Sequence, residues 1–194
     1  MPRHLFLTGP TGSGKSTLLR SVLGDTLRLA GGFITEAVTG PRGELNGLAL
    51  SPAAAAGGVA GFEPALFLDC RRFPPRTDNE VFRGTGVRLL QEATWYPYAL
   101  LDEIGGFELI IPQFRTALYE LLRTDLPLVG ALKTSEEADA MRRALGLGDK
   151  FSRYESELIR FLKQDKDTLI LDVRSPDDAA AAEALMRWRR ENLG

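Results

Sequence analysis

The stretch that decides the fold is Gly9-Pro10-Thr11-Gly12-Ser13-Gly14-Lys15-Ser16, followed by Thr17. It fits the pattern G-x-x-x-x-G-K-S/T, the phosphate-binding loop called Walker A. Glycines remove side chains where a ligand must approach closely, so main-chain N–H groups can turn toward phosphate oxygens. We therefore expect residues 9–17 to bind the phosphates of a nucleotide.

Two side chains of this loop have predicted chemistry of their own. Lys15 can reach the β- and γ-phosphates, and the hydroxyl group of Ser16 can ligate Mg²⁺. The apolar run 5–7 before the loop is typical of a buried strand, and the leucines and valine of residues 18–23 recur at helical spacing. Strand, glycine loop and helix follow one another as a phosphate loop requires.

Length and composition favour one soluble domain over residues 1–194. Hydrophobic residues make up 44% of the 194 residues and charged residues 26%, and the net charge is −2. This balance predicts neither nucleic acid nor a membrane surface as the main partner. We expect no signal peptide, since the first strand begins at once, and Cys70 as the one cysteine fits a reducing compartment. The expected location is cytoplasmic.

The rest of the chain alternates between strand and helix patterns, which predicts an α/β fold with a mainly parallel sheet. A glycine and proline turn at 40–43 separates two β-rich runs, so we expect a hairpin and some antiparallel strands. The predicted strands are 5–7, 31–39, 45–51, 65–70, 98–102, 127–132 and 168–173. The predicted later helices are 79–94, 112–123, 135–145, 152–165 and one that starts at Ser175. Ligands of such folds bind beyond the carboxyl ends of the strands.

An acidic pair follows the strand predicted at 98–102. Mg²⁺ takes oxygen ligands, usually one or two carboxylates together with phosphates and water. We expect Asp102 to hold this metal and Glu103 to polarise a water molecule for attack on the γ-phosphorus. Glu36, at the end of the second strand, is the rival candidate for that second role.

Four segments in this order resemble the small P-loop nucleoside-triphosphatases first described from thermophiles. They are residues 3–8 with the phosphate loop, Gly32-Phe33-Ile34-Thr35-Glu36, Leu101-Asp102-Glu103-Ile104-Gly105 with Glu108-Leu109, and Phe114. The resemblance implies a RecA-like three-layer fold, Mg²⁺ dependence and slow hydrolysis of ATP, GTP and other nucleoside triphosphates to the diphosphate and phosphate. The chain departs from the family pattern at Gly106 and Phe107, where the family usually has Lys and Met.

Three classes of function remain open on these residues. The first is a hydrolase of nucleoside triphosphates, in which Lys15 and Glu103 act on the γ-phosphate. The second is a P-loop kinase of a nucleotide or small molecule, with the arginine-rich segment 71–83 as a lid. The third is a nucleotide-dependent switch or assembly protein that binds a protein partner or a second copy. An arginine finger would raise the rate of hydrolysis, and the candidates are Arg71, Arg72, Arg76 and Arg83.

Overall fold

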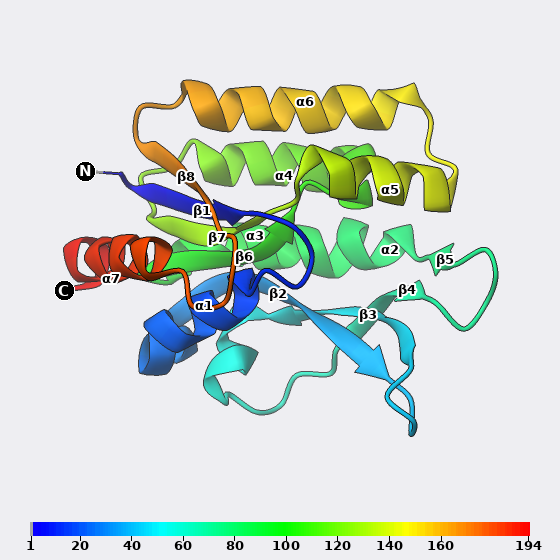
Figure 1. Ribbon diagram of the computed structural model, residues 1–194, viewed down its shortest axis with the longest axis horizontal. Coiled ribbons are helices and arrows are strands. Elements are labelled where there is room, and N and C mark those ends of the chain that lie inside the picture. Colours follow the sequence, from blue (N-terminus) through cyan, green and yellow to red (C-terminus); the bar gives the residue numbers. More distant parts are fainter. Residues whose placement is uncertain (1) are drawn as a thin grey trace.

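A mixed sheet of eight strands forms the centre of the computed structural model, which describes residues 2–194 (Figure 1). Its strands lie in the order β5-β4-β3-β2-β6-β7-β1-β8. Their bounds are β1 (His4–Thr8), β2 (Ala30–Thr39), β3 (Leu45–Pro52), β4 (Ala65–Asp69), β5 (Arg76–Thr77), β6 (Tyr98–Ile104), β7 (Leu128–Leu132) and β8 (Thr168–Asp172). The strand before the phosphate loop, β1, is therefore separated from the acidic strand, β6, by β7 alone.

The sheet has a parallel part and an antiparallel part. Strands β2, β6, β7, β1 and β8 pair in parallel, and β3, β4 and β5 extend the sheet from β2 by antiparallel pairing. The hairpin predicted around 40–43 is the β2–β3 connection, so that prediction is confirmed. The mainly parallel sheet with some antiparallel strands is confirmed as well.

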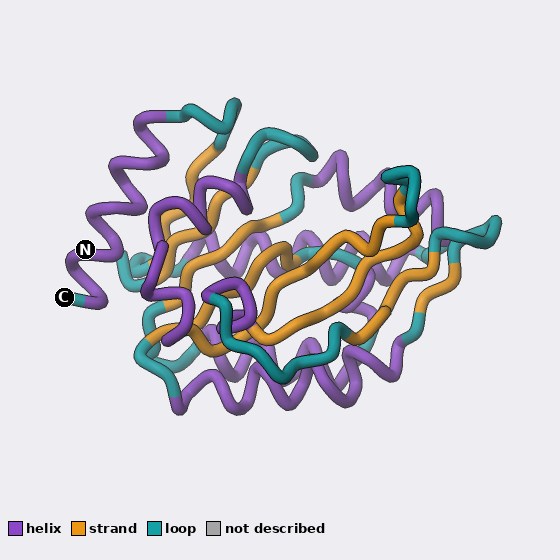
Figure 2. The backbone as a smooth tube through the Cα atoms, turned by 90° about the horizontal axis from the view of Figure 1, so that it is seen from below, coloured by secondary structure: helices purple, strands orange, loops and turns teal. Residues whose placement is uncertain are grey.

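Helices cover both faces of the sheet, which gives three layers (Figures 1 and 2). The helices are α1 (Lys15–Leu23), α2 (Asn79–Val81), α3 (Val87–Glu92), α4 (Pro112–Leu122), α5 (Ser135–Leu145), α6 (Asp149–Gln164) and α7 (Ala179–Leu193). A π-helical turn, Phe82–Gly86, joins α2 to α3. Short 3₁₀ turns occupy Gly24–Leu29, Ala53–Gly57, Ala93–Trp95 and Phe107–Ile110.

Side chains of the central strands alternate between two cores, one on each face of the sheet. In β1, Leu5 and Leu7 join the core under α1 and α7, whereas Phe6 joins the core under α3, α4 and α6. All three are fully buried, which explains why the sequence reads as a continuous apolar run. Within residues 2–194, no helix is long and apolar enough to cross a membrane.

Several predicted boundaries differ from those of the structure. Strand β6 runs to Ile104 instead of ending at Asp102. Helix α5 spans Ser135–Leu145 as predicted, and its cap is Thr134, whose side chain accepts from the Glu137 N–H while Glu137 accepts from the Thr134 N–H. Helix α7 begins at Ala179 with Asp178 as its cap, and residues 175–178 before it form a turn in which the Asp178 N–H donates to the Ser175 carbonyl at 3.2 Å and Pro176 lies against Gly14.

Candidate active site

The phosphate loop connects β1 to α1 in a conformation that needs its glycines. Gly9, Gly12 and Gly14 have φ angles of 141°, 81° and 93°, which side-chain-bearing residues rarely adopt. A Cβ atom at Gly9 would lie 2.2 Å from the carbonyl oxygen of Val173, and one at Gly14 would lie 2.6 Å from Cα of Pro176. The chain just after β8 therefore supports the loop from behind.

The first turn of α1 presents features that suit an anion. No side chain caps this nine-residue helix, and its first turn has no acidic residue. The N–H groups at the start of the helix and its dipole therefore favour negative charge in front of the loop. Ser13 is buried within the loop, and its hydroxyl oxygen has no hydrogen-bond partner among residues 2–194.

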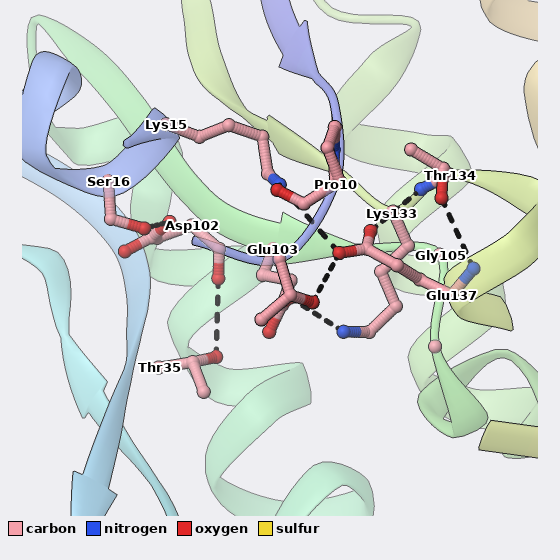
Figure 3. A network of polar contacts seen from close by, with 12 residues as sticks. Pro10, Lys15, Ser16, Thr35, Asp102, Glu103, Gly105, Lys133, Thr134 and Glu137 are labelled. Carbon is pink, nitrogen blue, oxygen red and sulfur yellow. Dashed lines mark hydrogen bonds and ion pairs between the residues drawn. The ribbon is translucent and has the colours of Figure 1, made fainter. Parts of the chain in front are cut away.

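Lys15 is the first residue of α1 and is almost fully buried. Its ammonium group donates hydrogen bonds to the carbonyl oxygens of Gly9 and Pro10, the second at 3.1 Å. Glu137 Oε1 lies 3.9 Å from Lys15 Nζ. The lysine side chain is thus folded back along the loop that precedes it, with its charge facing a carboxylate across the site (Figure 3).

Ser16 and Asp102 meet at the edge of the sheet. The Ser16 hydroxyl donates to Asp102 Oδ1 at 2.8 Å, which links the phosphate loop to β6. Asp102 is only 3% exposed, and burial raises the pKa of its carboxyl group against the opposing effect of the Ser16 hydrogen bond. The Asp102 carboxylate and the Ser16 hydroxyl together offer hard oxygen ligands. A nearby cation would stabilise the negative charge of the buried carboxylate.

A break in the pairing of β6 with β7 sets the position of this acidic pair. The register is regular to Leu101–Gly130 and resumes at Ile104–Leu132, so Asp102 and Glu103 lie in a bulge. Glu103 has a φ of 74°, and within residues 2–194 it is the one residue other than glycine with positive φ. A carboxylate residue in this conformation costs about 1–2 kcal/mol, and such strain concentrates at functional sites.

The bulge is held on both sides by polar contacts. Lys133, just after β7, places Nζ 2.6 Å from Glu103 Oε1 and donates its N–H to the Ile104 carbonyl at 2.9 Å. On the β2 side, the Thr35 hydroxyl donates to the Asp102 carbonyl at 3.2 Å. Figure 3 shows Thr35 below Asp102 and the Lys133 side chain beside Glu103.

Helix α5 reaches the site through Glu137. Its Oε1 atom accepts from the Thr11 hydroxyl at 2.5 Å, in addition to its position near Lys15. Burial alone would raise the pKa of Glu137, but hydrogen bonds from Thr11 and the Thr134 N–H, with the charges of Lys15 and Lys133, outweigh it and lower the pKa. Glu137 is therefore a carboxylate that faces the phosphate loop.

These elements enclose a cavity of about 310 Å³ at the carboxyl edge of the parallel strands. Its lining residues are Thr11, Gly12, Gly14, Lys15, Ser16, Thr17, Thr35, Asp102, Glu103 and Pro176. Six of the nine predicted loop residues and both predicted acids thus face one space. Gly9, Pro10 and Ser13 lie behind it and shape the loop, and their roles in binding stay predictions.

Other candidates lie elsewhere. Glu36 is within β2, accepts a hydrogen bond from Ser51 at 2.5 Å and does not line the cavity. Arg71 pairs with Asp69 on β4, and Arg83 pairs with Glu80. Strand β4 is five strands from β1 in the sheet, or about 24 Å, and within residues 2–194 no arginine lines the cavity.

Several residues of the site have no role that the sequence alone predicts. Thr35 belongs to the segment 32–36 of the family resemblance, and Lys133, Glu137 and Pro176 have no predicted part in the site. One signal was present, because Thr134 and Glu137 fit the capping-box pattern T-x-x-E. The contacts of Lys133 and Pro176 join parts of the chain that no short-range pattern connects.

Comparison with known proteins adds one finding to this geometry. The model of a family described as NTPase matches residues 4–173, a span that includes the phosphate loop, the acidic pair and the strand β8. No curated protein and no solved structure matches the chain. The three-layer arrangement is that of a P-loop NTPase. Because the family model matches most of the length of the chain, the chain belongs to the NTPase family.

Proposed function

We propose that the protein hydrolyses nucleoside 5′-triphosphates, such as ATP and GTP, to the diphosphate and phosphate, with Mg²⁺ as cofactor. One observation carries the proposal. The Ser16 hydroxyl contacts Asp102 at 2.8 Å in the cavity that Lys15 and Glu103 also line. A phosphate loop, a pair of oxygen donors and a second carboxylate therefore converge on one space.

The residues present fit Mg²⁺. Ser16 and Asp102 would hold it, because both offer oxygen atoms and the buried Asp102 carboxylate gains from a cation. When bound, Mg²⁺ neutralises charge on the β- and γ-phosphate oxygens. The family match supports nucleotide hydrolysis in general, and the Mg²⁺ dependence and the choice of substrates belong to this proposal.

The phosphate loop, Lys15 and Glu103 each have a distinct part in the proposed reaction. The loop N–H groups and Lys15 bind the phosphates and offset the negative charge that develops on them. Glu103 orients a water molecule and accepts its proton. The water oxygen then bonds to the γ-phosphorus while the bond from that phosphorus to the β–γ bridging oxygen breaks, which leaves the diphosphate facing Lys15.

We propose that turnover is slow without a partner. An arginine placed at the γ-phosphate is typically worth about 10³–10⁵ in rate, and no arginine in the described part of the chain lines the cavity. Hydrolysis would then depend on Lys15, the loop and the cofactor for charge stabilisation.

The test is phosphate release measured with a panel of nucleoside triphosphates, with and without Mg²⁺. Glu103→Gln keeps the size of the side chain and removes its base, so turnover is expected to fall about 10²–10⁴-fold while binding of a non-hydrolysable analogue is retained. Glu36→Gln is the matched control and is expected to keep wild-type turnover. Phosphate transfer to an added acceptor, with no release in its absence, would favour a kinase and refute the proposal.

A further inference from the structure

The ion pair between Lys133 and Glu103 is enclosed. Their side chains are 11% and 29% exposed, and Nζ lies 2.6 Å from Oε1. Of the ion pairs formed within residues 2–194, this is the only one that involves either residue. Because water screens it poorly, the pair restricts the Glu103 side chain more than a surface pair does.

The approach of Lys133 to Glu103 is built into the backbone. Lys133 follows β7 directly. Its backbone N–H donates a hydrogen bond to the carbonyl oxygen of Ile104, which is the first residue after the bulge. Its position along the chain is therefore fixed relative to the strained Glu103 (Figure 3). A flexible surface lysine has no such anchor.

Space for the lysine side chain comes from Gly106. A Cβ atom at this position would lie 3.1 Å from Lys133 Cε and 2.7 Å from Glu108 Oε2. Glu108 cannot move away easily, because it is buried and accepts from the N–H groups of Gly105 and Gly106 at 2.8 Å each. A side chain at residue 106 would therefore crowd both Glu108 and the end of the Lys133 side chain.

We infer that Lys133 is a positioning residue for hydrolysis, which holds the Glu103 carboxylate in the orientation that turnover requires, with Gly106 leaving it the room to do so. The inference rests on the proposed function, because it assumes that Glu103 acts on the attacking water. Glu103 has an unfavourable backbone conformation and a rotatable side chain, so it needs an external contact to define one orientation. Lys133 supplies that contact from the neighbouring strand without lining the cavity itself.

The experiment measures phosphate release and analogue binding for three single variants. Lys133→Met removes the charge at similar length, Lys133→Arg retains a charge, and Gly106→Ala crowds the lysine and Glu108 while the charges of Lys133 and Glu103 remain. We expect Lys133→Met to lower kcat about 10- to 100-fold with KM changed less than about threefold, since positioning is lost and binding is kept. Gly106→Ala should also lower kcat. Lys133→Arg should keep most of the wild-type kcat, because it retains the positive charge. Lys150→Met, on the exposed side of α6, is the control and should keep wild-type kinetics.

The Glu103→Gln background separates this inference from the proposed function. If Lys133 acts through Glu103, adding Lys133→Met to Glu103→Gln lowers kcat by less than about threefold further. A further loss of kcat as large as in the wild-type background would overturn the inference and leave the hydrolase proposal intact. Wild-type kcat in the single variant Lys133→Met would have the same two consequences. Wild-type kcat in Glu103→Gln would instead overturn the assignment of Glu103, and the inference with it.

Discussion

Replacing Glu137 with Gln should tighten the binding of a nucleoside triphosphate. Glu137 Oε1 lies 3.9 Å from Lys15 Nζ, and a phosphate oxygen bound to Lys15 lies about 2.8 Å from the same nitrogen. A bound γ-phosphate is therefore within about 7 Å of the Glu137 carboxylate. At an effective dielectric constant of about 20, two unit charges at that distance repel by about 2 kcal/mol. Removing the charge corresponds to about 30-fold tighter binding.

The substitution preserves the other contacts of residue 137. A glutamine amide oxygen can still accept from the Thr134 N–H, and its NH₂ group can donate to the Thr11 hydroxyl. Glu136→Gln removes the same charge one residue away, on an exposed side chain, and serves as the matched control.

The assay is titration with a fluorescent non-hydrolysable triphosphate, and with the corresponding diphosphate, followed by anisotropy at constant Mg²⁺ and salt. We expect a larger gain for the triphosphate than for the diphosphate, since the repelled group is the terminal one, and no gain for Glu136→Gln. Equal or weaker triphosphate binding by Glu137→Gln would refute the reasoning and show that the carboxylate assists binding.

Two further predictions concern stability. Asp102→Asn should raise the thermal midpoint at neutral pH without nucleotide or Mg²⁺, because burial raises the pKa of Asp102 and its ionised form destabilises the fold. The folded state then holds its proton more tightly than the unfolded chain, so wild-type stability falls as pH rises from about 4, and the gap between the proteins should widen with pH in calorimetry. Equal midpoints across that range would contradict this. Trp188→Ala should cost about 3–5 kcal/mol in urea unfolding, since the ring is 1% exposed and packs against Tyr98, whereas alanine in place of the exposed Trp95 should cost under 1 kcal/mol.

Local patterns predicted the parts of the fold that local physics determines. The apolar runs before the loop and before Asp102 became β1 and β6, and the turn at 40–43 became the β2–β3 hairpin. In each case the side chains that define the pattern are the ones that the sheet buries or the turn exposes. Glycine spacing likewise predicted a tight turn between β1 and α1, because Gly9, Gly12 and Gly14 all have positive φ there.

The remaining features depend on contacts between distant residues. Glu103 lies in a bulge because Lys133 and Ile104 meet across two strands, and nothing within the segment 98–104 requires positive φ. Thr11 and Glu137 touch although 126 positions separate them. Segment 79–94 was predicted as one helix, yet its middle widens into a π-turn at Phe82–Gly86, where two glycines weaken the regular α-helix and Phe82 inserts among the core aromatic rings.

The place of β1 in the sheet has a consequence for how the protein is made. Strand β1 pairs with β7 on one side and β8 on the other, and the glycines of the loop rest against Val173 and Pro176. During synthesis the phosphate loop leaves the ribosome well before its supports, because Val173 follows Gly9 by 164 positions. The loop therefore lacks these contacts while the intervening chain is made, and it gains them only when β8 pairs with β1.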